Sequence, residues 1–187
     1  EINDDRVRGL LVEQFPRWSG LPISLVSSSG TVNVVYRLGD DLCIRLPRLG
    51  TSVDSLERET RWLPALASQL SLTIPEPVEQ GRPGAGFPFR WAIYRWLAGE
   101  TYEPSRVSSV VEAADTLARF IAELRSIHAP DAPRSRRGIP LVARDAHARK
   151  AIRALRGKLD TTAAQATWET CLQAPEWDKQ AVWTHGD

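Results

Sequence analysis

The sequence predicts an α+β protein built as two lobes, and three observations support this fold class. The first half of the chain carries short apolar segments of strand length, and the second half carries longer segments with the apolar spacing of helices. A glycine-containing segment around Gly99 separates the two halves. We therefore predict an N-terminal lobe over residues 1–98 with an antiparallel sheet, and the start of a mainly helical C-terminal lobe over residues 99–187.

The composition limits the class of protein. Of the 187 residues, 42% are hydrophobic and 25% are charged, which is typical of a soluble globular protein. The net charge of +1 gives no reason to expect nucleic acid or an acidic membrane as a partner. Cys43 and Cys171 lie far apart, no apolar run reaches membrane-span length, and the first residues are unlike a secretory signal. We expect a cytoplasmic monomer or homodimer.

The N-terminal half predicts two helices and several strands. The first helix is capped by Asn3 or Asp4 and ends before Pro16. Pro64 is expected to kink the second helix or to split it. The expected ranges are 23–26, 32–38 and 42–46 for strands, 53–70 for the second helix, 74–78 for an extended connector, 81–86 for a hairpin tip and 89–97 for its return strand.

The C-terminal half predicts a long helix that starts near Arg106. Its apolar positions recur at helical spacing and predict a buried stripe that ends at a core histidine; the stripe consists of Val107, Val110, Val111, Ala114, Leu117, Ala118, Ile121, Leu124 and His128. A basic loop over residues 130–140 follows. Two shorter helices are expected around residues 146–156 and 163–172.

A loop rich in hydroxyl side chains joins the first two strands, with the sequence Ser-Ser-Ser-Gly-Thr-Val-Asn over residues 27–33. A phosphate group needs several backbone N–H groups that converge on one point and short side chains that leave room for it. This loop offers both. Many hairpin tips of similar composition bind nothing, so the loop by itself is a weak signal.

Arg45 and Glu59 are candidates for an ion pair. Arg45 lies in an apolar strand, where a buried charge requires a partner. Glu59 lies three residues after Leu56 on the apolar face of the second helix, whereas Glu57 points elsewhere. The pattern predicts an Arg45–Glu59 pair. Two alternatives remain: an arginine on an edge strand that reaches water, or a salt bridge with a purely structural role.

Two further segments have the features of a nucleotide-dependent enzyme. Residues 91–100 form a bulky apolar strand that runs into a glycine-containing hinge, where exposed backbone groups can bind the edge of an adenine. A central strand followed by a plain linker has the same pattern. His185-Gly186-Asp187 follows a short apolar strand, and an aspartate at the end of a strand is well placed to act as a general base.

The order of these features is similar to that of the protein-kinase-like fold. His185-Gly186-Asp187, with glycine in the middle, resembles the aminoglycoside phosphotransferase and choline kinase branch of that fold rather than the protein kinases. The stretch Tyr36–Arg48, followed by Glu57-Arg58-Glu59, resembles the bacterial antibiotic-phosphotransferase family. This resemblance covers essentially the whole chain and implies a bilobal kinase-like fold.

The resemblance implies an ATP-dependent phosphotransferase, with GTP as a possible donor and Mg²⁺ as the metal. Such an enzyme moves the γ-phosphate to a hydroxyl of a small molecule. The acceptor is either an aminoglycoside-type antibiotic, whose modification gives antibiotic resistance, or a related metabolite. The residues implied are Ser28, Ser29, Gly30, Thr31 and Asn33 over the triphosphate, Arg45 on the α- and β-phosphates with Glu59 holding it, Tyr94, Arg95 and Leu97 at the adenine edge, Asp187 as the base and His185 as a brace of the catalytic loop.

Two departures from the family pattern affect the expected activity. Arg45 stands where the fold usually has a lysine, which keeps the positive charge. The family's metal ligands, an asparagine shortly after the catalytic aspartate and a later aspartate, are expected beyond Asp187, so no metal ligand is expected within these residues. The absence of methionine suggests that the first residues are missing as well. Residues 1–187 alone are therefore expected to show no phosphotransfer.

The sequence leaves two alternatives for the acceptor substrate and two for the activity of the protein. Residues 134–158 carry nine Lys or Arg residues against Asp145 alone, which makes them a poor wall for a polycationic aminoglycoside. Either an acidic wall lies elsewhere, or the natural substrate is not an aminoglycoside. The alternative to an active enzyme is a catalytically inactive kinase-fold protein that binds a nucleotide or a partner.

Overall fold

The computed structural model describes residues 2–27, 30–50, 53–100, 102–133, 138–176, 178 and 180–185. The chain forms two compact units, Glu1–Ile127 and His128–Asp187. The first unit holds an antiparallel sheet with helices, and the second is helical in its described part. The predicted α+β class is therefore confirmed, and each unit is described below by itself.

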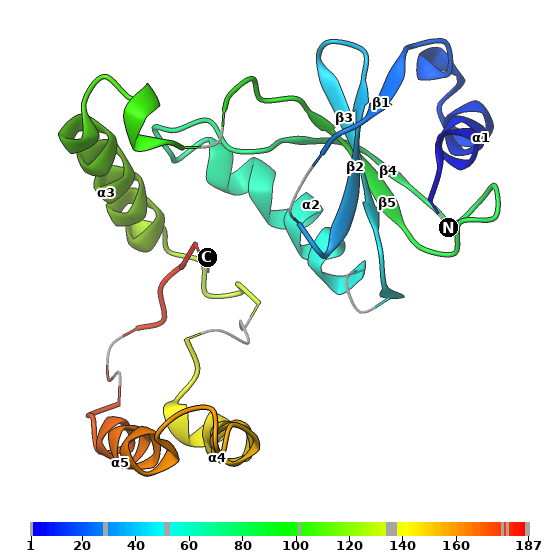
Figure 1. Ribbon diagram of the computed structural model, residues 1–187. Coiled ribbons are helices and arrows are strands. Elements are labelled where there is room, and N and C mark those ends of the chain that lie inside the picture. Colours follow the sequence, from blue (N-terminus) through cyan, green and yellow to red (C-terminus); the bar gives the residue numbers. More distant parts are fainter. Residues whose placement is uncertain are drawn as a thin grey trace. The chain divides into compact units, whose positions relative to one another are not determined.

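A five-stranded sheet forms the centre of the first unit (Figure 1). The strands follow the order β1-β2-β3-β5-β4, and every neighbouring pair is antiparallel. The central strand β3 carries Arg45, which lies opposite Val35 on β2 and Ala92 on β5. The bounds are β1 Ile23–Leu25, β2 Asn33–Leu38, β3 Leu42–Pro47, β4 Pro77–Gly81 and β5 Trp91–Arg95.

Helix α1 (Asp4–Gln14) covers one face of the sheet (Figure 1). The Asn3 side chain accepts a hydrogen bond from the Arg6 N–H at 3.0 Å, which confirms the predicted cap. A short 3₁₀ helix, η1 (Pro16–Trp18), follows. The core between α1 and the sheet is entirely buried; it consists of Val7, Leu10, Leu11, Val34, Tyr36, Leu38, Ile44, Leu46, Phe87, Trp91 and Ile93.

Helix α2 (Val53–Ala67) packs against the opposite face of the sheet (Figure 1). It continues through Pro64 as one element, so the helix is not split, and it ends three residues before Leu70. The core on this face is smaller. Its buried members are Cys43, Leu56, Ala92 and Tyr94, with Val35, Leu63 and Trp96 packed against them.

The β4–β5 hairpin confirms the predicted turn and depends on a glycine. A Cβ at Gly81 would lie 2.0 Å from the Trp91 ring, so a larger residue there would displace the indole. The Trp91 indole N–H also donates to the Arg82 carbonyl at 3.1 Å. Because Trp91 is fully buried, this close approach ties the hairpin to the core beneath α1.

The long helix α3 (Val110–Ser126) starts later than expected, after a 3₁₀ turn, η3 (Pro104–Arg106). Ser109 caps it by accepting the Glu112 N–H at 3.2 Å. The predicted buried stripe is wrong in most positions: Val111 is 70% exposed and His128 is also exposed. Among the described residues of α3, the buried ones are Phe120 and Leu124.

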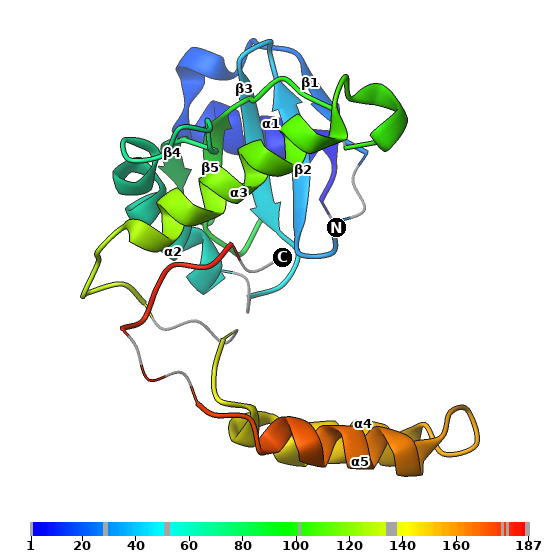
Figure 2. The same ribbon diagram turned by 90° about the vertical axis from the view of Figure 1, so that its left-hand side faces the viewer.

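The second unit contains η4 (Leu141–Arg144), α4 (Asp145–Ala154) and α5 (Thr161–Leu172), with α4 and α5 side by side (Figures 1 and 2). The Asp145 carboxylate accepts hydrogen bonds from Trp168 Nε1 at 2.7 Å and Arg149 Nε at 2.8 Å, and these bonds lower its pKa. Arg149 also pairs with Glu169 at 3.2 Å. Across the described ranges, no helix is long and apolar enough to cross a lipid bilayer.

Candidate functional site

The site is centred on the predicted ion pair between β3 and α2. Arg45 Nη1 lies 2.5 Å from Glu59 Oε2. The two side chains are 25% and 27% exposed, so the pair lies at the margin of the core and one side of it reaches solvent. Glu57 instead pairs with Arg90 at the surface, at 3.3 Å. The predicted pairing of Arg45 with Glu59 rather than Glu57 is confirmed.

Tyr94 is the third member of this cluster. Its hydroxyl lies 3.2 Å from Glu59 Oε2, and the Arg45 guanidinium lies over its ring at 5.0 Å from the centroid. Ser55 Oγ approaches the other carboxylate oxygen at 3.4 Å. Burial, followed by the charge of Glu59, raises the pKa of the Tyr94 hydroxyl above its ordinary value, so the group is neutral at physiological pH.

The hydroxyl-rich loop is described in part. Ser28 and Ser29 lie outside the described residues, Gly30 and Thr31 are exposed, and Asn33 begins β2 opposite Pro47. Two backbone hydrogen bonds of 2.9 Å hold the ends of the loop, from Val26 N–H to the Val35 carbonyl and from Arg48 N–H to the Val32 carbonyl. The loop therefore leaves the sheet next to the strand that carries Arg45.

The predicted hinge follows β5 directly. Arg95 is the last residue of β5, and its side chain pairs with Glu76 at 3.3 Å. Leu97 is 38% exposed, and its N–H makes no hydrogen bond to any other described residue. Trp96 N–H donates to the Asp41 carbonyl at 2.8 Å, and Arg37 lies over the Trp96 ring at 4.2 Å. These contacts tie the start of the hinge to the β2–β3 turn.

The predicted catalytic residues lie at the end of the chain. His185 is described and exposed, whereas Gly186 and Asp187 lie outside the described residues. His185 belongs to the second unit and Arg45 to the first. The structure thus brings Arg45, Glu59 and Tyr94 together, and the role of the His-Gly-Asp motif remains a prediction from the sequence.

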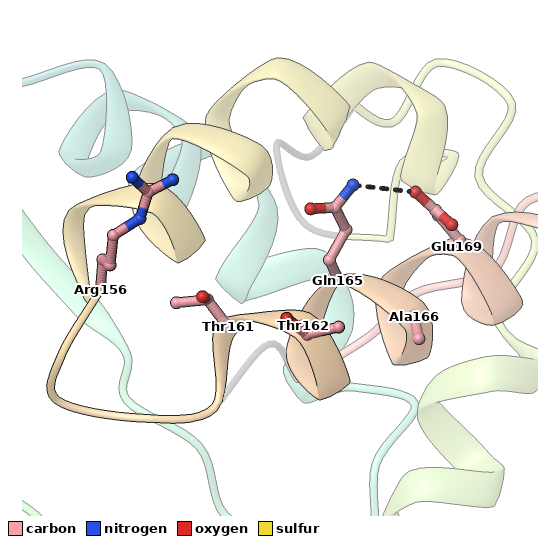
Figure 3. Close-up of a pocket in the computed structure, with 6 residues that line it drawn as sticks. All are labelled: Arg156, Thr161, Thr162, Gln165, Ala166 and Glu169. Carbon is pink, nitrogen blue, oxygen red and sulfur yellow. Dashed lines mark hydrogen bonds between the residues drawn. The ribbon is translucent and has the colours of Figure 1, made fainter.

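A hollow of about 360 Å³ lies on α5 of the second unit (Figure 3). Arg156, Thr161, Thr162, Gln165, Ala166 and Glu169 line it. Gln165 donates to Glu169, one turn further along α5, at 3.1 Å. It contains none of the predicted site residues, and its wall combines a cation, hydroxyls and a carboxylate without one dominant charge.

The cluster in the first unit has donors that can bind an anionic group such as a phosphate. Arg45 has five N–H donors, and Glu59 is its one carboxylate partner among the described residues, so donors remain for a phosphate. The Leu97 N–H offers a donor for a base edge. Within the described ranges, no group of three or more His, Cys, Asp or Glu side chains is arranged to hold a metal ion.

Solved structures of phosphotransferases match this arrangement of elements. A point mutant of aminoglycoside 2'-phosphotransferase-IIIa with GDP matches over 99% of this chain, with a TM-score of 0.78 and 20% identity. APH(2'')-IIIa with GDP and kanamycin matches over 95%, with a TM-score of 0.77 and 20% identity. The apoenzyme of macrolide 2'-phosphotransferase MphH from Brachybacterium faecium matches over 98%, with a TM-score of 0.63 and 22% identity. The chain spans 64%, 63% and 64% of these three structures.

The fold is therefore the protein-kinase-like fold of the aminoglycoside phosphotransferases, as the sequence motifs predicted. The family model described as the phosphotransferase enzyme family matches residues 25–187, and the chain belongs to this family. A sequence search of curated proteins finds no match.

Proposed function

We propose that the protein is a nucleotide-dependent phosphotransferase that moves the γ-phosphate of ATP, or of GTP, to a hydroxyl of a small molecule. The observation that carries the proposal is the Arg45–Glu59 pair at 2.5 Å, formed between β3 and α2 in a chain of the phosphotransferase enzyme family. Structures of related fold include complexes with GDP, ADP and ATP, which supports nucleotide binding.

In this proposal the residues of the first unit bind and orient the nucleotide. Arg45 contacts the α- and β-phosphates through the donors that Glu59 leaves available, and Glu59 fixes the direction of the guanidinium. The loop that includes Ser28, Ser29, Gly30, Thr31 and Asn33 covers the triphosphate, and the Arg95 carbonyl and Leu97 N–H bind the base edge. Mg²⁺, when bound with the nucleotide, neutralises charge on the phosphates.

The acceptor is proposed to be a hydroxylated small molecule. Asp187 would orient and deprotonate its hydroxyl, and His185 would brace the loop that carries Asp187. Structures of related fold include complexes with kanamycin, streptomycin and gentamicin and a macrolide phosphotransferase. The basic character of residues 134–158 favours an acceptor that is less cationic than an aminoglycoside.

Transfer is tested on the whole protein with a panel of acceptors. Consumption of ATP and GTP is measured with aminoglycosides, macrolides, choline and sugars, and the phosphorylated product is identified by mass spectrometry. We expect one acceptor class to give product, and Asp187→Ala to abolish transfer while nucleotide binding persists. Binding of nucleotide without transfer to any acceptor would favour the catalytically inactive alternative.

A further inference from the structure

We propose that Tyr94 is a positioning residue of the nucleotide site, and that its hydroxyl holds the Glu59 carboxylate in place so that Arg45 remains directed at the phosphates. This inference rests on the proposed function and deepens it. The family resemblance placed Tyr94 at the adenine edge. The geometry instead points to a contact with the helix that carries the carboxylate.

The contact is specific because two donors meet one oxygen. Glu59 Oε2 accepts from Arg45 Nη1 at 2.5 Å and from the Tyr94 hydroxyl at 3.2 Å. The two donors come from different strands, β3 and β5, and the acceptor comes from α2. The hydroxyl thus connects α2 to β5, the strand next to the central one, without using any donor of Arg45.

The surroundings of Tyr94 make it a rigid anchor. Its side chain is 1% exposed and packs with Cys43, Leu56 and Ala92, so the ring has little freedom to move. Burial and the nearby Glu59 raise the pKa of its hydroxyl, which keeps the donor proton on the oxygen at neutral pH. Arg45 is 25% exposed and can therefore reach a phosphate, whereas Tyr94 stays in the core.

The partly exposed Arg45 and the buried Tyr94 are suited to different roles, the first to bind phosphate and the second to position Glu59. A bound phosphate shares the Arg45 guanidinium with Glu59, so the direction of the guanidinium depends on where the Glu59 carboxylate is held. The Tyr94 hydroxyl holds that carboxylate through a second hydrogen bond while Arg45 contacts the phosphate. Removal of the hydroxyl should therefore weaken the phosphate-dependent part of nucleotide affinity more than the base-dependent part.

The test compares Tyr94→Phe with a matched control, Tyr36→Phe. Tyr36 is also buried, at 2% exposure, but it packs beneath α1 on the opposite face of the sheet. The dissociation constants of the full chain for Mg²⁺-ATP, Mg²⁺-GTP, adenosine and guanosine are measured by calorimetry. For Tyr94→Phe we expect triphosphate affinity to fall about 3- to 30-fold, the scale of one hydrogen bond to a charged group, with nucleoside affinity unchanged.

The control and a second substitution separate positioning from packing. Tyr36→Phe should keep the wild-type ratio of triphosphate to nucleoside affinity. In a Glu59→Ala background, Tyr94→Phe should add little further loss, because both changes break the same contact. Equal losses for triphosphate and nucleoside, or losses that add fully with Glu59→Ala, would overturn the positioning role.

The outcomes also distinguish this inference from the proposed function. If the wild-type chain binds triphosphate and Arg45→Ala weakens that binding while Tyr94→Phe does not, the function stands and the role of Tyr94 is wrong. If the wild-type chain binds neither ATP nor GTP, the proposed function fails, and the role of Tyr94 fails with it.

Discussion

The two faces of the central sheet are built from alternate residues of the same strands, yet their chemistry differs. On β3, Leu42, Ile44 and Leu46 face α1, whereas Cys43 and Arg45 face α2. The α1 face is a continuous apolar core whose largest members are fully buried. The α2 face has a smaller apolar cluster beside a charged pair that is about a quarter exposed.

This difference indicates which face stabilises the fold and which is available for binding. Burial of apolar surface is the main source of stability, and the α1 face buries most of it. A charge pair in a partly buried position contributes little net stability because its desolvation offsets its attraction. A protein that needed stability alone would gain by an apolar pair at these positions, so the cost at Arg45 and Glu59 is consistent with a binding role.

The largest effect is expected on the α1 face, from Ile44→Ala. Ile44 is fully buried in the core beneath α1. Its truncation should lower the free energy of unfolding by about 2–5 kcal/mol through lost burial and a residual cavity. Chemical denaturation measures this loss. A change below about 1 kcal/mol would contradict the assignment of the main core to this face.

A smaller loss of stability, with a large loss of nucleotide affinity, is expected from Glu59→Ala. The substitution leaves Arg45 and the Tyr94 hydroxyl without their shared acceptor. Because the pair is partly exposed, the free energy of unfolding should fall by about 1–3 kcal/mol. Denaturation and nucleotide titration on the same preparation check both effects. Full nucleotide affinity in a folded Glu59→Ala chain would mean that the pair is only structural.

An alkaline pH series compares the buried tyrosines of the two faces. Burial raises the pKa of Tyr94 and of Tyr36 above the ordinary 10.0. Above pH 10 the unfolded chain releases protons that the folded chain keeps, so stability falls as pH rises, by at most about 1.4 kcal/mol per pH unit for each proton. Well below pH 10 both hydroxyls are protonated in the folded and the unfolded chain, so their ionisation should not change stability with pH. Denaturation of Tyr94→Phe and Tyr36→Phe across this range should show a shallower decline than the wild type.

The smallest effect is expected at the start of α1, from Asn3→Ala. The change removes the side-chain acceptor of the Arg6 N–H and should cost about 1 kcal/mol of stability. Because α1 covers the face opposite the charge pair, nucleotide affinity should not change. Thermal or chemical denaturation with a parallel binding titration measures both. A loss of affinity here would show that the two faces are coupled.

The sequence predicted those parts of the site that depend on local composition and helical spacing. The apolar residues around Arg45 predicted that its charge needs a partner, and helical spacing placed Glu59 rather than Glu57 on the inner face of α2. The Tyr94–Glu59 contact was not predicted because it depends on the register of β3 against β5, which places Cys43 opposite Tyr94. Strand register is set by contacts between distant segments, and alternation within one strand does not reveal it.

The long helix α3 shows what helical spacing alone does not predict. Helical spacing correctly predicted a long helix, but the stripe that it predicted to be buried is mostly exposed, with Val111 and Leu117 at 70% and 54%. Phe120, which lies outside the predicted stripe, is buried instead. Spacing shows which residues share a face of a helix, whereas burial also requires a second layer against that face. The sequence of one helix does not specify where such a layer lies.

The most direct test of the difference between the two faces uses neighbouring residues of β3. The chain is titrated with Mg²⁺-ATP and Mg²⁺-GTP as wild type, as Arg45→Ala and as Ile44→Ala, each at a temperature where it is folded. We predict saturable binding by the wild type, binding at least about tenfold weaker in Arg45→Ala from loss of a charge-assisted contact, and near wild-type affinity in Ile44→Ala. Equal affinity of Arg45→Ala and the wild type, or no binding by the wild type, would contradict the assignment of the α2 face to nucleotide binding.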